Sequence, residues 1–218
     1  MAREHAHGGG HGHAHGPGRG GDHPRDQNGN PLDLAAYLER LESPERAAWQ
    51  KPDALVAALG LAPGATAADV GSGPGYFTLR LARAVGPGGT VFGLDVDPRM
   101  TELLAARARE AGLANVVPVL APGGDGLPPR PCDLILLVNA FHHFPDGPAY
   151  LGRLAGALAP GGRIALVDFH EGELPVGPPP EHRVTRAAID AAVAAAGLRV
   201  AEEHRLLPHQ HFLLLARR

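Results

Sequence analysis

Cysteine, lysine and long apolar runs are scarce or absent in this chain of 218 residues. Cys132 is the only cysteine, so no disulfide forms within the chain and no cysteine-based zinc or iron–sulfur site can be built from it. We expect Cys132 to pack as a small apolar residue. No apolar run is long enough to cross a bilayer, and the N-terminus lacks the hydrophobic segment of a secretion signal. We therefore expect a soluble, cytoplasmic protein without a membrane partner.

An excess of positive charge is absent as well. Lys and Arg total 20 against 23 Asp and Glu, which gives a formal net charge of −3. A chain with this balance has no broad attraction for phosphate backbones, so nucleic acid is a poor candidate partner. The length fits one domain with a two- or three-layer core and is too short for two full domains.

Residues 1–30 form a histidine- and glycine-rich tail with almost no large apolar side chain. Such a segment buries too little surface to offset its ordering entropy, so we expect it to be disordered. Closely spaced imidazoles bind Ni²⁺, Cu²⁺ or Zn²⁺, and capture of a divalent metal by the tail is a side hypothesis. The histidines concerned are His5, His7, His11, His13, His15 and His23.

The folded domain is expected over residues 31–218. Within it, residues 31–62 predict three short helices that cover the site, because Pro44 and Pro52 each follow a helix start signal. From Thr66 the pattern alternates between strands and helices, which is typical of a doubly wound parallel sheet with its ligands at the carboxyl ends of the strands. The expected strands are 66–70, 90–95, 116–120, 133–138 and 163–169, and the helices between them are 76–85, 98–111 and 148–159.

The last part of the chain departs from this alternation. A proline-rich loop over 171–182 precedes a helix over 185–196 and two closing strands, 199–206 and 211–216. Only four residues separate these strands, and so short a connection requires antiparallel pairing.

A glycine-rich loop carries the strongest functional signal. A strand ends at Asp69, a loop contains Gly71, Gly73 and Gly75, and a helix follows. This arrangement presents bare backbone N–H groups and a helix N-terminus to a nucleotide-like cofactor. Tyr76 stands where a dinucleotide fingerprint has glycine or alanine, which disfavours a nicotinamide-dependent oxidoreductase.

Four motifs in order identify a resemblance to a known family. They are ADVGSGPGYFT (68–78), VFGLDVDPRM (91–100), CDLILLVNAFHHFPD (132–146) and LAPGGRIALVDFH (158–170). Residues 63–218 resemble the class I S-adenosylmethionine-dependent methyltransferases, close to their small-molecule type-11 and ubiquinone-biosynthesis-like branches. The resemblance implies a Rossmann-like, seven-stranded sheet whose last strand inserts antiparallel between the fifth and the sixth. It also implies S-adenosyl-L-methionine as cofactor and a small-molecule acceptor with an O, N or C nucleophile.

The resemblance further implies roles for individual residues. The amino-acid half of the cofactor would be held by Asp69 and by the loop residues Gly71, Ser72, Gly73 and Gly75. Asp95, which ends the second strand, would bind the ribose hydroxyls, and Val96 would flank the adenine. Asn139 would form the wall between cofactor and acceptor.

One position departs from the family pattern. The acid expected to reach the adenine amino group is Asp125, but it lies closer to Leu127 and Pro128 than the family acid does. A backbone amide within 122–124 is the alternative contact.

Several histidines are expected to converge on the acceptor side of the site. One of His143, His170 and His209 is the hypothesised general base, because a neutral imidazole suits removal of a proton from a hydroxyl or an acidic carbon. For the His142–His143 pair itself, a structural role that fixes the loop is favoured.

Two alternatives concern metals, and a third concerns catalysis itself. A metal-dependent mechanism is disfavoured because this region has few carboxylates, and arsenite methylation is disfavoured by the single cysteine. A non-catalytic S-adenosylmethionine-binding regulatory module is the competing class, and the intact glycine loop and ribose acid favour an enzyme. The acceptor and the oligomeric state stay open.

Overall fold

Seven strands form one sheet in the order β3-β2-β1-β4-β5-β7-β6 in a computed structural model that describes residues 32–218. β7 pairs antiparallel with both β5 and β6, and the other pairs are parallel. The doubly wound sheet with an antiparallel last strand is therefore confirmed, and the expected tail lies outside the described residues. The strands are β1 (Thr66–Val70), β2 (Thr90–Asp95), β3 (Val116–Leu120), β4 (Cys132–Val138), β5 (Leu158–Phe169), β6 (Leu198–Glu203) and β7 (Gln210–Arg217).

The helices begin at the capping signals of the sequence. Ser43 Oγ accepts a hydrogen bond from the backbone of Glu45, and Thr185 Oγ1 accepts one from the backbone of Ala188. Proline occupies the first position of several helices, where its missing N–H costs nothing. The helices are α1 (Leu34–Glu42), α2 (Pro44–Gln50), α3 (Pro52–Ala58), α4 (Thr78–Val85), α5 (Pro98–Glu110), η1 (Phe141–His143), α6 (Gly147–Gly156), η2 (Pro180–His182) and α7 (Arg186–Ala195).

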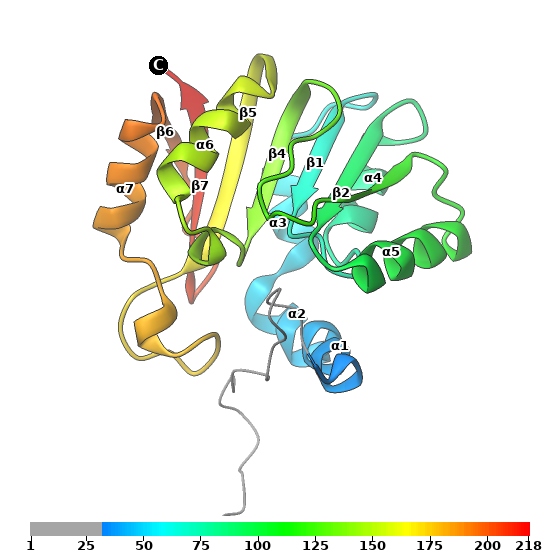
Figure 1. Ribbon diagram of the computed structural model, residues 1–218, viewed down its shortest axis with the longest axis horizontal. Helices are drawn as coiled ribbons and strands as arrows, with labels where there is room; N and C mark the ends of the chain where they lie inside the picture. Colours follow the sequence, from blue (N-terminus) through cyan, green and yellow to red (C-terminus); the bar gives the residue numbers. More distant parts are fainter. Residues whose placement is uncertain (1–31) are drawn as a thin grey trace, which may run out of the picture.

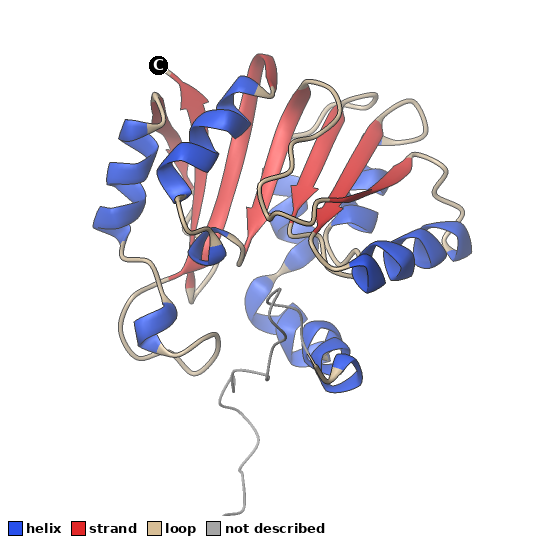
Figure 2. Ribbon diagram, in the orientation of Figure 1, coloured by secondary structure: helices blue, strands red, loops and turns tan. Residues whose placement is uncertain are grey.

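Helices cover both faces of the sheet (Figures 1 and 2). α3 and α4 contribute side chains such as Leu55 and Leu81 to one core, whereas α6 and α7 contribute Leu151 and Ile189 to the core on the opposite face. Burial on both faces explains why the central strands read as continuous apolar runs. The cysteine at the start of β4 is fully buried in the second of these cores, as expected.

α1 and α2 are not part of either layer. Figure 1 shows them below the carboxyl ends of β1 and β4, at the edge of the sheet that also carries the segment between β5 and α7. Lys51, which joins α2 to α3, adopts a left-handed conformation with φ of 44°. This turn directs α2 away from the sheet layer and over the carboxyl edge.

Several boundaries differ from the sequence prediction, most of them by one to three residues. α4 begins at Thr78 rather than at residue 76, because a turn over the preceding glycines delays the helix. β5 begins at Leu158, where it pairs with Cys132 across a register shift. The loop between β6 and β7 spans six residues rather than four, yet the pairing is antiparallel as expected. Within the described residues, no helix is long and apolar enough to span a membrane.

Candidate cofactor and acceptor site

A cavity of about 1350 Å³ lies at the carboxyl ends of the strands. Its walls come from α1 and α2, from the loops after β1, β2, β3 and β4, and from residues 176–184. Seven of the residues expected to bind the cofactor line it, namely Asp69, Gly71, Ser72, Gly73, Asp95, Val96 and Asn139. Its position agrees with the rule that ligands of open α/β sheets bind outside the carboxyl ends of the strands.

The backbone N–H groups of the glycine loop are not bare, and this expectation is wrong. The amides of Gly71 and Ser72 both donate to the Leu94 carbonyl at 2.9 Å, and the Gly75 amide donates to the Ser72 carbonyl. The Gly73 amide donates to Asp95 Oδ2 at 2.7 Å. These bonds tie the loop to the end of β2, so these four amides already have acceptors within the protein.

Glycine is required in this loop for two reasons. Gly71 has φ of +76°, and a Cβ there would lie 3.1 Å from the Ala140 Cβ. Gly75 has φ of +99°, and its Cβ would lie 2.6 Å from Leu104 Cδ1. Gly75 does not line the large cavity, so its contribution to the site is to let the loop pack against α5.

Asp69, the next-to-last residue of β1, is a buried carboxylate that lines the cavity. Its Oδ2 accepts a 2.6 Å hydrogen bond from the Thr78 hydroxyl at the start of α4. Burial raises the pKa of Asp69 to about 6, although the bond from Thr78 opposes this shift. Burial therefore makes the negative charge of Asp69 unfavourable, and a cationic ligand group beside it would stabilise that charge.

Asp95 occupies the corresponding place at the end of β2. Its Oδ2 accepts from the Gly73 amide, and its Oδ1 accepts from the Asp97 amide at 3.0 Å. Burial raises its pKa, and these two backbone bonds oppose the shift. The carboxylate is thus fixed in the cavity wall beside Val96.

The structure does not place Asp125 in this cavity. Its side chain is 68% exposed and lies 3.4 Å from the guanidinium of Arg153 on α6. The neighbouring Gly124 and Gly126 line the cavity instead. The Gly124 amide donates to the Ala121 carbonyl at 3.0 Å, so the alternative of a backbone amide contact within 122–124 stays a prediction.

Asn139 stands where β4 ends, in a left-handed conformation with φ of 54°. Its side-chain oxygen accepts a hydrogen bond from Gln210 Nε2 on β7. Gln210 Oε1 in turn accepts from Gln50 Nε2 on α2 at 3.0 Å. A chain of three amides therefore fixes α2 and the strained Asn139 to the sheet, and such strain collects at functional sites.

His142 lines the cavity and forms a buried pair with Asp168, which the sequence interpretation missed as a functional unit. His142 Nδ1 lies 2.9 Å from Asp168 Oδ1, and the two side chains are 6% and 1% exposed. Asp168 also accepts the backbone N–H groups of His142 and Phe169. The available signal was topological: β4 and β5 are neighbours, so an acid that ends β5 lies beside the turn that follows β4.

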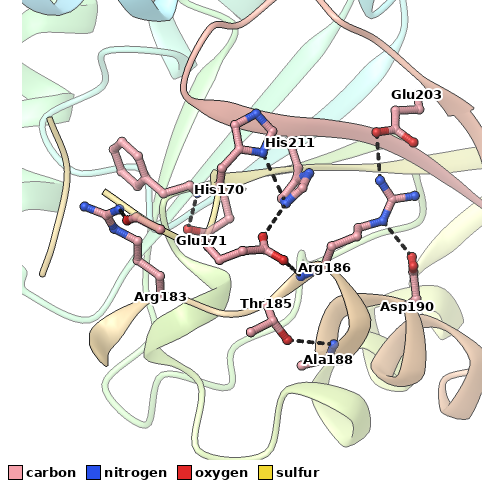
Figure 3. A network of polar contacts seen from close by, with 12 residues as sticks. His170, Glu171, Arg183, Thr185, Arg186, Ala188, Asp190, Glu203 and His211 are labelled. Carbon is pink, nitrogen blue, oxygen red and sulfur yellow. Dashed lines mark hydrogen bonds and ion pairs between the residues drawn. The ribbon is translucent and has the colours of Figure 1, made fainter. Parts of the chain in front are cut away.

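The three histidines expected to supply a base have different surroundings. His143 lines the cavity, whereas His170 and His209 do not. His170 Nδ1 lies 3.3 Å from His211 Nε2, which also lies 3.3 Å from Glu171 Oε2 (Figure 3). This network lowers the pKa of His170, mainly through burial and secondly through His211.

The same network links the loop after β5 to α7. Glu171 Oε1 accepts the backbone N–H of Arg186, whose guanidinium pairs with Asp190 and Glu203 (Figure 3). In the part of the chain that the structure describes, no group of three or more His, Cys, Asp or Glu side chains is arranged to hold a metal ion. We interpret the network as a support for the loop.

Comparison with known proteins gives relatives of one kind. The chain is similar to nocamycin O-methyltransferase of Saccharothrix syringae, with 40% identity over 118 residues, which cover 54% of this chain and 40% of the relative. It is also similar to the aklanonic acid methyltransferase DauC of a Streptomyces species, with 36% identity over 114 residues, which cover 51% of this chain and 52% of the relative. The chain thus spans about half of the length of these curated relatives.

A solved structure and a family model also match this chain. A methyltransferase from Aquifex aeolicus, described as dependent on SAM, has a TM-score of 0.76 and 25% identity, and the match covers 83% of this chain and 96% of that one. The family model described as "Methyltransferase domain" matches residues 61–203, which include β1 to β6 and the glycine loop. The chain therefore belongs to the methyltransferase domain family.

Proposed function

We propose that the protein is an S-adenosylmethionine-dependent methyltransferase that acts on a hydroxyl group of a small molecule. The observation that carries this proposal is one cavity lined by Asp69, Asp95 and His142, in which His142 is paired with the buried Asp168 behind it. Family membership and the small-molecule relatives support the reaction class.

The residues present fit this cofactor. Asp69 would accept from the ammonium of its amino-acid half, since a cation relieves the cost of the buried carboxylate. Asp95 would accept from the two ribose hydroxyls, and Val96 with Gly124 would flank the adenine. When bound, S-adenosylmethionine supplies an electrophilic methyl group on a sulfonium.

His142 is the proposed general base, in place of the three histidines expected from the sequence. Asp168 accepts from Nδ1–H of His142, which leaves Nε2 as the unprotonated nitrogen that takes the acceptor's proton. A hydroxyl is the nucleophile that best uses such a base, because it becomes strongly nucleophilic only when its proton is removed.

The remaining walls orient the acceptor and exclude water. Trp49 on α2 and Phe169 at the end of β5 both line the cavity, with ring centroids 5.7 Å apart. The rigid Pro178–Pro179 segment lies in the wall of the same cavity. Apolar and aromatic walls of this kind hold a planar acceptor in position, and alignment is the main task in a direct displacement.

Calorimetry with S-adenosylmethionine and S-adenosylhomocysteine on the full chain is the first test. We expect both to bind, and we expect Asp95→Asn to weaken both by about tenfold or more through loss of charge-assisted hydrogen bonds. Release of S-adenosylhomocysteine is then followed across a panel of phenols, enols and hydroxylated acids. If the folded protein binds neither S-adenosylmethionine nor S-adenosylhomocysteine at millimolar concentration, the proposal is refuted. Cofactor binding without turnover of any acceptor would favour the regulatory module instead.

A further inference from the structure

The glycine loop offers no hydrogen-bond donor to the carboxylate of an α-amino acid ligand. An α-amino acid group carries an ammonium and a carboxylate, and Asp69 matches only the ammonium. The amides of Gly71, Ser72, Gly73 and Gly75 all donate within the protein. A carboxylate at this end of the cavity therefore needs a donor from another segment.

Arg46 on α2 is placed to supply that donor. It lines the cavity together with Asp69 and the glycine loop. The loop lies close to the α1–α2 junction, because a Cβ on Gly73 would be 3.7 Å from Leu41 Cδ1. The Leu41 carbonyl accepts from Arg46 Nη1 at 2.8 Å, which brings the guanidinium to the same junction.

The guanidinium of Arg46 is held rigidly. Its Nε donates to Gln50 Oε1 at 2.6 Å, and Gln50 is itself fixed by the amide chain to β7. Its carbon lies 4.1 Å from the centroid of the Tyr76 ring, in a cation–π arrangement. These contacts orient the planar group while they leave Nη2 without an acceptor among the described residues, and an Arg fork is suited to carboxylates.

The charge of Arg46 has no carboxylate within ion-pair distance in residues 32–218, although other arginines near the loop are paired. Arg80 lies 2.9 Å from Asp53, and Arg99 lies 2.6 Å from Asp97. Burial lowers the pKa of Arg46 to about 10, and the charge of Asp69 opposes this shift. Arg46 is therefore a partly desolvated cation at neutral pH, next to a partly desolvated anion.

We infer that Arg46 binds the carboxylate of the cofactor's amino-acid half, opposite the Asp69 carboxylate that accepts from its ammonium. This inference rests on the proposed function, since it names a binding residue of the same cofactor. It also explains why α1 and α2 lie over the glycine loop: the cap contributes half of the amino-acid subsite. Cofactor binding then joins the cap to the sheet through Arg46 as well as through Gln50.

A pair of ligands that differ only in this carboxylate tests the inference. Calorimetry on the full chain compares S-adenosylmethionine with decarboxylated S-adenosylmethionine. We expect the wild-type protein to bind the first about 10- to 100-fold more tightly, the range for charge-assisted hydrogen bonds. In Arg46→Gln the two affinities should agree within about threefold. Arg80→Gln is the matched control, because Arg80 also lies over the Tyr76 ring, with its guanidinium carbon 4.4 Å from the centroid, but pairs with Asp53 and does not line the cavity. This variant should keep the wild-type ratio.

Each outcome has one meaning. Equal affinities for the two ligands in the wild-type protein, or a ratio that Arg46→Gln leaves unchanged, would overturn the inference. Failure of the wild-type protein to bind either ligand would refute the proposed function instead. Arg46→Lys, which keeps the charge but loses the fork, should give an intermediate ratio, and circular dichroism with a thermal melt shows that each variant is folded. If Arg46→Gln does not fold, the wild-type ratio and the ratio in Arg46→Lys decide.

Discussion

His142 Nδ1 lies 2.9 Å from Asp168 Oδ1, both side chains are almost completely buried, and His142 lines the cavity. Asp168 has its oxygens directed by two further backbone N–H donors, so it accepts from His142 in a fixed direction. A carboxylate in this position sets the tautomer of the imidazole and stabilises the imidazolium that forms when the ring takes a proton. The pair therefore acts as one unit, in which Asp168 orients the imidazole of His142.

Asp168→Asn should lower kcat strongly and leave cofactor affinity nearly unchanged. The amide of Asn donates to Nδ1 and forces the proton onto Nε2, the nitrogen that must accept it. We expect a loss of about 10²- to 10⁴-fold in kcat, the range for loss of general base catalysis. The measurement is turnover with the acceptor found in the screen, next to calorimetry with S-adenosylhomocysteine. His209→Gln is the control, because His209 lies outside the cavity lining and should keep full turnover. More than a third of wild-type kcat in Asp168→Asn would exclude His142 as the base.

The unliganded protein should lose stability as pH rises because of Asp69. Burial raises the pKa of this carboxyl from 3.8 to about 6 in the folded state. Between about pH 4 and pH 6 the folded protein keeps a proton that the unfolded chain has released, so the free energy of unfolding falls as pH rises through this window and is level above it. The total loss is about 3 kcal/mol.

Asp69→Asn removes this titration and supplies the comparison. Its free energy of unfolding minus that of the wild-type protein should increase from pH 4 to pH 6.5 and then stay constant, as measured by urea unfolding at a series of pH values. Asp53→Asn, at an exposed ion pair with Arg80, should show no such change. A difference between Asp69→Asn and wild type that does not vary with pH would contradict the assignment.

The sequence predicted the sheet well because its strands are buried on both faces. Continuous apolar runs, separated by residues such as Gly112, identify the order and type of the strands and helices, although not every boundary. The four-residue separation before His211 indicated an antiparallel closing pair, and the pairing of β6 with β7 bears this out. Local pattern and global fold agree at these places, which is why both could be inferred from one chain.

The contacts within the site could not be predicted in the same way. Spacing placed Asp95 and Gly73 at the same edge of the sheet but gave no sign that the amide of one bonds the carboxylate of the other. The His142–Asp168 pair joins two strand ends that are 26 residues apart, and Arg46 reaches the loop only because Lys51 turns α2 over the edge. Such contacts depend on side-chain directions in three dimensions, which hydrophobic periodicity does not encode.

Gly75→Ala should destabilise the protein more than Gly64→Ala. Both glycines have positive φ, +99° and +85°, so alanine is strained at either position by about 1 kcal/mol. At Gly64 no atom lies within 4 Å of the added Cβ, whereas at Gly75 it would lie 2.6 Å from Leu104 Cδ1, in a residue that is fully buried. Overpacking adds about 1–3 kcal/mol, so Gly75→Ala should cost about 2–4 kcal/mol in total. Chemical denaturation of the two variants measures their free energies of unfolding. Equal losses of stability would show that Leu104 shifts at no cost to accommodate the added Cβ.

Gln210→Leu should loosen the cap formed by α1 and α2. Gln210 is 1% exposed, and its removal leaves the buried Gln50 Nε2 and the half-buried Asn139 Oδ1 without their partner. Two unsatisfied groups cost about 2–4 kcal/mol, which lowers Tm by roughly 5–12 °C for a domain of this size. Limited proteolysis should then cut within residues 32–51 faster than in the wild-type protein.

A double-mutant cycle shows whether Gln210→Leu destabilises the protein through the lost hydrogen bond to Gln50 or through lost packing. Gln50→Leu combined with Gln210→Leu replaces both partners by apolar groups, so the double variant should lose less stability than the sum of the single variants, by about 1 kcal/mol or more. Strict additivity would mean that the two amides act independently. In that case α2 would be held over the glycine loop by its apolar contacts alone, and its position there would not depend on the hydrogen bond between Gln50 and Gln210.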